Sequence, residues 1–320
     1  MILMTKRLLP LLLPAALTLA ACGAEPASET DRPQVVVSFY ALEYAAKQVL
    51  GDAADVQTLT QPGVEAHDLE LKPSQIADIG SADLVVYLDE FQPAVDEAVA
   101  QSGNQRVLDV SAVVDLLETG DEHAEEDEHA EEEDEHAEEE GEHEEHGDYD
   151  PHFWQDPLRV AAVGEAIAEE IATTHPELEE QLQANASALR EELTSLDEEF
   201  VSGLEECVRR EFVTSHQAFG YLADRYDLTE IGISGLNPED EPSPARIAEV
   251  HELAREHGVT TIFFETLTSP AVAEAVAGDL GLETAVLDPL EGVSENSPGE
   301  DYPSIMRANL EALKQANDCR

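Results

Sequence analysis

The sequence has 320 residues, and its 72 acidic against 16 basic side chains give a formal net charge of −56 at pH 7. This acidic excess argues against a nucleic-acid partner and against docking on anionic lipid by charge, and it favours cations as ligands. Residues 34–320 are long enough for two domains of ordinary size.

The first 21 residues have the pattern of a secretory signal peptide, in which Lys6 and Arg7 precede a short apolar stretch. The stretch ends in Leu-Ala-Ala-Cys, which resembles a bacterial lipobox with Cys22 as the lipid-bearing residue; the alternative is an ordinary secreted cysteine. We therefore expect a lipoprotein anchored through Cys22 on the extracytoplasmic face of the cell membrane. Residues 22–33, rich in Ala, Ser, Glu and Pro, would form its flexible tether.

Strands and helices alternate in residues 34–175, which we expect to form an N-terminal α/β lobe. Apolar runs predict strands, whereas caps and helical periodicity predict helices. The expected helices cover 41–50, 74–80 with Ser74 as its cap, and a segment opened by Pro93. The expected strands are 35–39, 56–60, 84–88 and 106–110.

Residues 121–148 interrupt this lobe with an acidic, histidine-rich repeat, DEHAEE. The 28 residues contain 18 Asp or Glu, 5 His, 3 Ala and 2 Gly, so they cannot build a core and are expected to form a solvated loop. Imidazoles and carboxylates on such a chain can gather zinc weakly and adaptably. The alternative is an acidic linker with incidental histidines. The residues proposed for auxiliary metal capture are His123, His129, His136, His143 and His146.

Two helices are expected between the halves of the chain, at 156–174 and 176–207. In the second, apolar residues recur at spacings of three, four or seven, which places them on one face. At about 1.5 Å per residue this helix measures roughly 45 Å, so we expect it to link and brace two lobes. A self-standing coiled coil is disfavoured, because the pattern covers only about four heptads.

Residues 208–320 repeat the alternation and are expected to form a C-terminal α/β lobe. Helices are expected at 218–226, 244–256 and 270–280, between strands at 211–215, 230–233, 260–264 and 284–287. The predicted fold is two open parallel-sheet lobes joined by a long rigid helix. A ligand would bind in the interlobe cleft, where the carboxyl ends of the strands face each other.

Cys207 and Cys319 are the other two cysteines of the chain, and an even pair in an oxidising compartment predicts a disulfide. Two buried free thiols are the alternative. A zinc site built from them is disfavoured, because neither lies in a Cys-x-x-Cys pair.

Three of the six histidines outside the acidic loop follow expected strands or the loop itself: His67, His152 and His216. The others, His175, His251 and His257, lie in or beside helices and are expected to be solvated. Two carboxylates, Glu265 and Asp288, also follow strands of the second half. A compact set of three imidazoles and one carboxylate suits Zn²⁺, whereas Mn²⁺, Mg²⁺ and Ca²⁺ prefer more oxygen ligands.

Several segments together resemble the metal-binding solute-binding proteins of bacterial ABC importers, and within them the zinc-specific branch. The resemblance implies two lobes braced by a long helix, one metal bound between them, and delivery of that metal to a membrane permease. It covers nearly the whole mature chain. The segments that carry it are 62–75 (PGVEAHDLELKPSQ), 82–84 (ADL), 150–157 (DPHFWQDP), 214–222 (TSHQAFGYL), 241–243 (EPS) and 287–290 (LDPL).

The resemblance implies that His67, His152 and His216 are metal ligands, with Asp288 as the fourth. Manganese-type relatives place Glu at the third position, so His216 favours zinc. Some zinc-binding members use a Glu near the first histidine, or water, in place of the distal Asp; here that Glu would be Glu65. We expect Glu265 to accept a hydrogen bond that fixes a histidine tautomer.

The function expected is that of a zinc receptor with one tight Zn²⁺ site, which passes the ion to an ABC permease. The protein would be a monomer, would bind no nucleic acid and would not be an enzyme. Alternatives are a manganese receptor of the same family and a metal-binding adhesin or metal buffer. A zinc hydrolase is disfavoured, because the chain lacks His-Glu-x-x-His and a four-ligand site leaves no position for a catalytic water.

Overall fold

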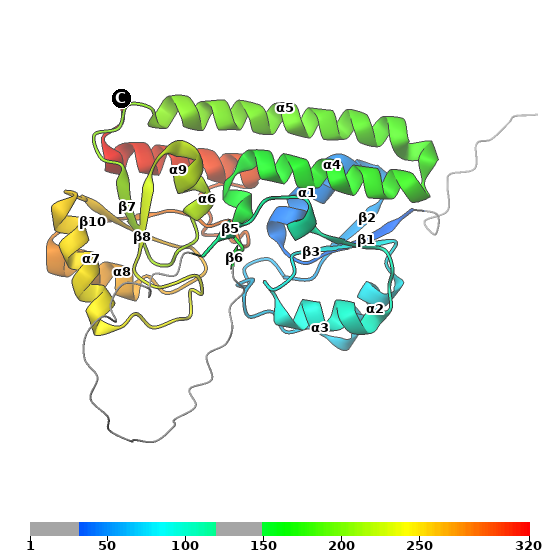
Figure 1. The fold of residues 1–320 in the computed structure, drawn as a ribbon, viewed down its shortest axis with the longest axis horizontal. Helices are drawn as coiled ribbons and strands as arrows, with labels where there is room; N and C mark the ends of the chain where they lie inside the picture. The colour runs from blue at the N-terminus through cyan, green and yellow to red at the C-terminus, as the bar shows by residue number, and fades with distance from the viewer. Residues whose placement is uncertain (1–31, 120–148) are drawn as a thin grey trace, which may run out of the picture. The chain divides into compact units, whose positions relative to one another are not determined.

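A computed structural model of the chain describes residues 32–119 and 149–320 (Figure 1). The predicted signal peptide, the lipidation residue Cys22, nearly all of the tether and the histidine-rich segment 121–148 lie outside the described residues. In the part of the chain that is described, no helix combines the length and apolarity needed to cross a membrane.

The N-terminal sheet has four parallel strands in the order β2-β1-β3-β4. They are β1 (Gln34–Val37), β2 (Asp55–Thr58), β3 (Leu84–Tyr87) and β4 (Val107–Asp109). Successive side chains of a strand point to opposite faces. Val35 and Val37 therefore pack under α1 (Tyr40–Leu50) and α4 (Pro157–Thr174), while Val36 packs toward α2 (Pro73–Ser81) and α3 (Pro93–Ser102). The predicted strands are confirmed to within two residues at either end.

The start of α2 differs from the prediction. The N-cap is Lys72 rather than Ser74, and the backbone N–H of Lys72 donates to Oε1 of Gln75 at 3.0 Å. Pro73 occupies the first helical turn, where its fixed φ and missing N–H are both tolerated. The proline therefore sets the boundary.

The C-terminal sheet is also parallel, in the order β10-β9-β7-β8. Its strands are β7 (Glu211–Thr214), β8 (Thr229–Gly232), β9 (Thr261–Phe264) and β10 (Glu283–Val286). The helices α6 (Gly220–Tyr226), α7 (Pro244–Glu256) and α8 (Ala271–Leu280) follow the predicted segments closely.

A helix that the sequence reading did not predict, α9 (Tyr302–Asn317), completes the C-terminal lobe. Asp301 and Ser304 form a capping box at its start. Ile305, Met306 and Leu310 then recur on one face and are buried. The signal for this helix was therefore present in the sequence.

The long helix α5 (Glu179–Leu204) connects the two lobes, as predicted, and forms a helical layer with α4, α1 and α9 (Figure 1). A short turn of 3₁₀ helix, Pro176–Leu178, precedes it. Gly164 of α4 allows the close packing of α4 on α5, because a Cβ there would lie 2.5 Å from Cδ2 of Leu189. The apolar face of α5 is buried at Leu182, Ala186, Leu189, Leu193, Leu196, Phe200 and Leu204.

The predicted disulfide between Cys207 and Cys319 is present and joins positions 112 residues apart in the sequence. It connects the end of α5 to the end of α9. A second unpredicted feature is a short antiparallel pair, β5 (Leu117–Glu118) with β6 (Tyr149–Asp150). This pair joins described residues on either side of the segment 121–148 and leads directly into His152.

Candidate metal centre

Four side chains from distant parts of the chain converge between the lobes: His67, His152, His216 and Glu291. Their potential ligating atoms all lie within 4.8 Å of one another. Oε1 of Glu291 lies 3.2 Å from Nε2 of His152, 3.2 Å from Nε2 of His216 and 3.5 Å from Nε2 of His67. His67 follows β2, His216 follows β7 and Glu291 follows β10, so the group forms where the carboxyl ends of parallel strands meet.

His152 is oriented by Asp150, which lies two residues earlier. Oδ1 of Asp150 lies 2.7 Å from Nδ1 of His152 and accepts the backbone N–H of His152 at 2.9 Å. The contact leaves Nε2 of His152 pointing at Glu291. Gly220 makes room for this carboxylate, since a Cβ at that position would stand 2.6 Å from Oδ2 of Asp150. Sequence reasoning missed the role of Asp150, although the Asp-x-His spacing was visible.

The segment carrying His152 is hydrogen-bonded mainly to the C-terminal lobe. Trp154 Nε1 and Gln155 Nε2 donate to the carbonyl of Pro289 at 2.7 and 2.6 Å. Tyr302 Oη donates to the carbonyl of Trp154 at 2.6 Å, and Tyr221 Oη donates to the carbonyl of Asp150 at 2.7 Å. These buried hydrogen bonds fix the backbone on both sides of the histidine.

His216 is oriented by Glu265, the residue that the sequence reading proposed as a tautomer-fixing acceptor. Oε1 of Glu265 lies 2.6 Å from Nδ1 of His216 and also accepts from the hydroxyl of Ser215. An imidazole held at Nδ1 presents Nε2 to a metal, an arrangement common around metal-bound histidines.

The buried carboxylate of Glu230 holds the loop that carries His216. It accepts from Thr214 Oγ1 at 2.8 Å and from the backbone N–H groups of Ala218 and Phe219 at 3.2 and 3.0 Å. Burial raises the pKa of Glu230 to about 7, against the hydrogen bond from Thr214.

The fourth member of the group corrects the sequence reading, which placed Asp288 there. Asp288 is buried, but its Oδ2 accepts from Thr266 Oγ1 at 2.9 Å and its Oδ1 from the backbone N–H of Leu290 at 2.9 Å. Both oxygens thus stabilise the turn that precedes Glu291. Leu290 adopts a left-handed φ of 62°, which changes the direction of the backbone so that Glu291 points toward the three histidines. Leucine rarely adopts this conformation, so no local signal in the sequence pointed to it.

Glu65, the alternative oxygen ligand, lies beside the group and contacts Glu291. Its Oε2 accepts the backbone N–H of His67 at 2.9 Å, which holds the turn bearing that histidine. Burial, followed by the charge of Glu291 and a hydrogen bond with it, raises the pKa of Glu65 to about 8. Glu65 is therefore protonated at neutral pH and shares a hydrogen bond with the carboxylate of Glu291.

The charges in the group are balanced by shared protons. Burial disfavours the charged form of His152, but Asp150 and Glu291 outweigh it and raise its pKa to about 9. Burial likewise acts against His216, yet Glu265 and Glu291 hold its pKa well above the ordinary value. Burial would raise the pKa of Glu291, but hydrogen bonds with the three imidazoles hold it well below its usual range.

His67 differs from the other two imidazoles in both exposure and charge. Burial lowers its pKa, only partly opposed by Glu291. Its side chain retains 10% exposure, whereas those of His152 and His216 retain 0% and 1%. His67 is thus the member of the group that solvent reaches.

The other three histidines of the described residues lie apart from this group. His175 contacts Glu177 at 3.4 Å and His257 contacts Glu211 at 3.1 Å, each as a partly exposed surface pair. His251 departs from the expected solvated state, because its Nε2 is buried and finds no hydrogen-bond partner among the described residues.

Three imidazole nitrogens and one carboxylate oxygen are a donor set that suits a four-coordinate, borderline metal ion. The set is buried, preorganised by hydrogen bonds to Asp150 and Glu265, and could hold one metal ion. Four protein donors fill a tetrahedral shell. The arrangement is therefore suited to binding an ion rather than to activating a water molecule.

Comparisons with known proteins agree with this geometry. Residues 35–316 match the protein family described as zinc-uptake complex component A, periplasmic. The chain is 35% identical over 314 residues to the zinc-binding lipoprotein AdcA of Streptococcus pneumoniae strain R6, covering 95% of this chain and 59% of that protein. It is 36% identical over 311 residues to the high-affinity zinc uptake system protein ZnuA of Bacillus subtilis strain 168, covering 94% of each.

Among solved structures, Zn(II)-bound AdcA from Streptococcus pneumoniae has a similar fold. The TM-score is 0.72 at 34% identity, and the match covers 90% of this chain and 58% of the AdcA chain. The present chain therefore spans less than two thirds of the streptococcal protein, but nearly all of the Bacillus one.

Proposed function

The chain belongs to the zinc-uptake complex component A family, and we propose that it is an extracytoplasmic zinc receptor that captures Zn²⁺ and delivers it to an ABC permease. The observation that carries the proposal is the buried group of His67, His152, His216 and Glu291. Zinc is the cargo of this site.

The donor set favours zinc over manganese. Three of its four members are imidazoles, and the two most buried ones are held by carboxylates at Nδ1. Manganese prefers more oxygen donors and a higher coordination number than such a set provides. We therefore assign zinc as the ion bound tightly, with manganese bound more weakly.

Delivery to a permease fits a chain that is exported and held at the membrane. Proteins described as periplasmic or as lipoproteins are among its relatives, which supports an extracytoplasmic location. Lipid attachment at Cys22 is part of the proposal and rests on the lipobox-like sequence before it. We propose that the protein acts as a monomer, because one chain supplies all four donors. We also propose that it catalyses no reaction, because four protein donors fill a tetrahedral shell.

The test is a calorimetric titration of the chain from residue 23 onward with Zn²⁺ and Mn²⁺. One tight zinc site per chain, with manganese binding much weaker, is the expected result. A Glu291→Ala variant should lose the tight site, while an exposed control, Glu180→Ala on α5, should retain it. Equal or tighter manganese binding would reassign the protein as a manganese receptor, and the absence of any tight site would leave the adhesin or metal-buffer roles.

Delivery needs a separate measurement, because tight binding alone does not distinguish a receptor from a buffer. Zinc-limited cells lacking the gene should regain zinc accumulation with the native chain but not with Glu291→Ala. Detergent extracts should also contain the protein together with an ABC permease. Normal zinc accumulation in the deletion strain would argue against the delivery role.

A further inference from the structure

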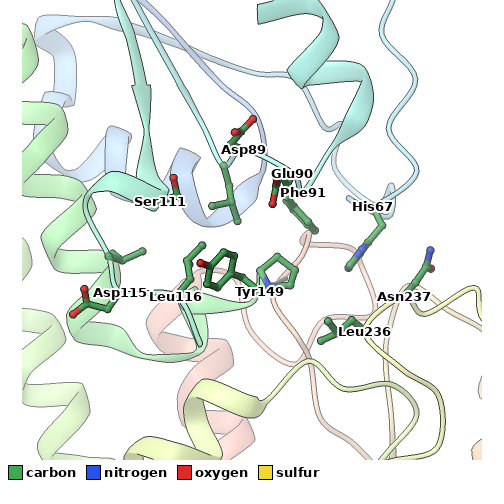
Figure 2. Close-up of a pocket in the computed structure, with 13 residues that line it drawn as sticks. His67, Asp89, Glu90, Phe91, Ser111, Asp115, Leu116, Tyr149, Leu236 and Asn237 are labelled. Atoms are coloured by element: carbon green, nitrogen blue, oxygen red, sulfur yellow. The ribbon is translucent and has the colours of Figure 1, made fainter. Parts of the chain in front are cut away.

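A cavity of about 490 Å³ opens beside the metal centre and includes His67 in its wall (Figure 2). Its other walls come from three loops of the two lobes. Asp89, Glu90 and Phe91 follow β3, Asp115 lies before β5, and Asn237 comes from the loop after β8. In Figure 2 the ring of His67 extends from the chain into the space that these loops enclose.

Three carboxylates stand in the wall of the cavity, and among the described residues no Lys or Arg side chain lines it. Asp89, Glu90 and Asp115 are all exposed, and within residues 32–119 and 149–320 no basic side chain pairs with their carboxylates. Glu90 adopts a left-handed φ of 62°, unusual for a residue other than glycine. An unpaired acidic lining of this kind attracts divalent cations and repels anions.

A second cavity, of about 320 Å³, approaches the same centre from another direction but has a different character. It is lined by Tyr40, Tyr44 and Lys47 and reaches Glu291, whose side chain is only 1% exposed. The positive charge of Lys47 opposes the approach of a cation, although Glu43 pairs with it. Of the two cavities, only the first combines unpaired carboxylates with the member of the metal group that solvent reaches.

We propose that the cavity beside His67 is the access route by which a hydrated divalent cation enters the centre, with Asp89, Glu90 and Asp115 steering it. This inference rests on the proposed zinc-binding function. Six waters occupy about 180 Å³ at roughly 30 Å³ each, so a fully hydrated ion fits within the cavity. His67 is the first ligand the ion meets, and the buried His152, His216 and Glu291 replace further waters afterwards.

The route also determines which form of the metal can enter. The three carboxylates favour a free hydrated cation over a metal held in an anionic chelate such as a citrate complex. Because the carboxylates act before the ion is bound, their main effect is on the association rate.

The association rate of zinc is measured by stopped flow with residues 23–320 of the chain. Trp154, the only tryptophan of the chain, has its ring centroid 5.2 Å from that of His152 and serves as a fluorescent reporter. Displacement of zinc from a fluorescent indicator provides an independent signal. The test variant is Asp89→Asn/Glu90→Gln/Asp115→Asn. The matched control is Glu169→Gln/Glu170→Gln/Glu180→Gln, which removes the same charge from exposed positions on α4 and α5.

The association rate of the test variant should fall roughly tenfold at about 0.01 M salt, where the Debye length is about 30 Å. At about 1 M salt, where the Debye length is about 3 Å, the rates of the variant and the native chain should converge. The control should keep the native rate. A single Asp115→Lys variant should also slow association. Because it changes one exposed side chain, it tests the route even if the triple variant misfolds.

The outcomes separate the access route from the proposed function. Native association rates in both Asp115→Lys and the triple variant, with tight zinc binding retained, would overturn the route and leave the receptor assignment intact. Equal slowing in the control would also overturn it, because overall charge would then explain the effect. Absence of a tight zinc site in the native chain would overturn both proposals.

Discussion

Zinc binding should release about two protons per ion at pH 7, because the metal must replace protons that the apo centre holds. The pKa of His152 is raised to about 9 by Asp150 and Glu291, against burial, and the pKa of His216 is raised well above its ordinary value. Both rings are therefore protonated on both nitrogens at pH 7. Each must lose the proton on Nε2 before its lone pair can bind a metal.

The other two members of the centre contribute no protons in this range. Burial lowers the pKa of His67, so its ring is already neutral at pH 7. Glu291, hydrogen-bonded to the imidazoles, has a pKa well below its ordinary value and is already ionised. The two protons therefore come from His152 and His216.

The sign and size of the pH effect follow from this count. Each proton released weakens apparent affinity about tenfold for every pH unit below the pKa concerned. Two protons give a dissociation constant that rises about 100-fold as the pH falls from 8 to 7. Affinity should rise with pH and begin to flatten above about pH 9, where His152 loses its proton in the apo protein.

The assay combines competition against a chelator of known affinity at pH 6 to 9 with calorimetry in two buffers of different ionisation enthalpy. Glu65, with a pKa of about 8, could release a further proton when the metal neutralises Glu291, so the titration is repeated with Glu65→Gln. The variant should still release about two protons. An affinity that does not change with pH, with no protons released, would show that His152 and His216 are neutral in the apo protein and would refute the reasoning.

Three further results are expected. Glu291→Gln should weaken zinc binding by more than the 10- to 100-fold typical of losing an outer partner. The isosteric Asp288→Asn should change zinc affinity by less than about tenfold, because Asp288 is engaged by the backbone rather than aimed at the centre. The reverse order in the same titration would restore Asp288 as the ligand. The double variant Cys207→Ser/Cys319→Ser should lose about 4 kcal/mol of unfolding free energy in a denaturant titration, given the long loop that the disulfide closes, while keeping one zinc per chain; unchanged stability would contradict this account. Deleting residues 121–148 should abolish weak additional zinc binding in calorimetry and preserve the tight site, and loss of the tight site would identify loop histidines as primary ligands.

Much of the fold could be predicted because its signals are local. The runs around Val36 and Leu84 are apolar on both faces, as strands of a covered parallel sheet must be. The convergence of His67 and His216 followed from the same logic, because residues after parallel strands gather at one edge of the sheet. The helix α9 carries a capping box and an apolar face, so it too was predictable from local signals in the sequence.

The fourth member of the group could not be predicted in this way, because its position depends on backbone conformation. Asp288 and Glu291 are both buried acidic residues after β10, and sequence spacing alone favours neither. The left-handed conformation of Leu290 and the contact of Asp288 with Thr266 decide between them. Asn309 of α9 holds the same turn from a distant part of the chain, since it accepts from the backbone N–H of Asp288 at 2.9 Å and donates to the carbonyl of Asp288 at 2.7 Å.

Chimeras built from two relatives must respect the hydrogen bonds that Trp154 and Gln155 donate to Pro289 and that Tyr302 donates to Trp154. If the crossover were placed near residue 175, His152 would come from the same parent as the N-terminal half. Such a hybrid would take the two sides of this buried hydrogen-bonded interface from different parents. A crossover before β6, at Tyr149, would keep His152 with Pro289, Tyr302, His216 and Glu291 from one parent. The other parent would then supply His67 and the first sheet, so exchange at that point would vary one member of the metal group while preserving three.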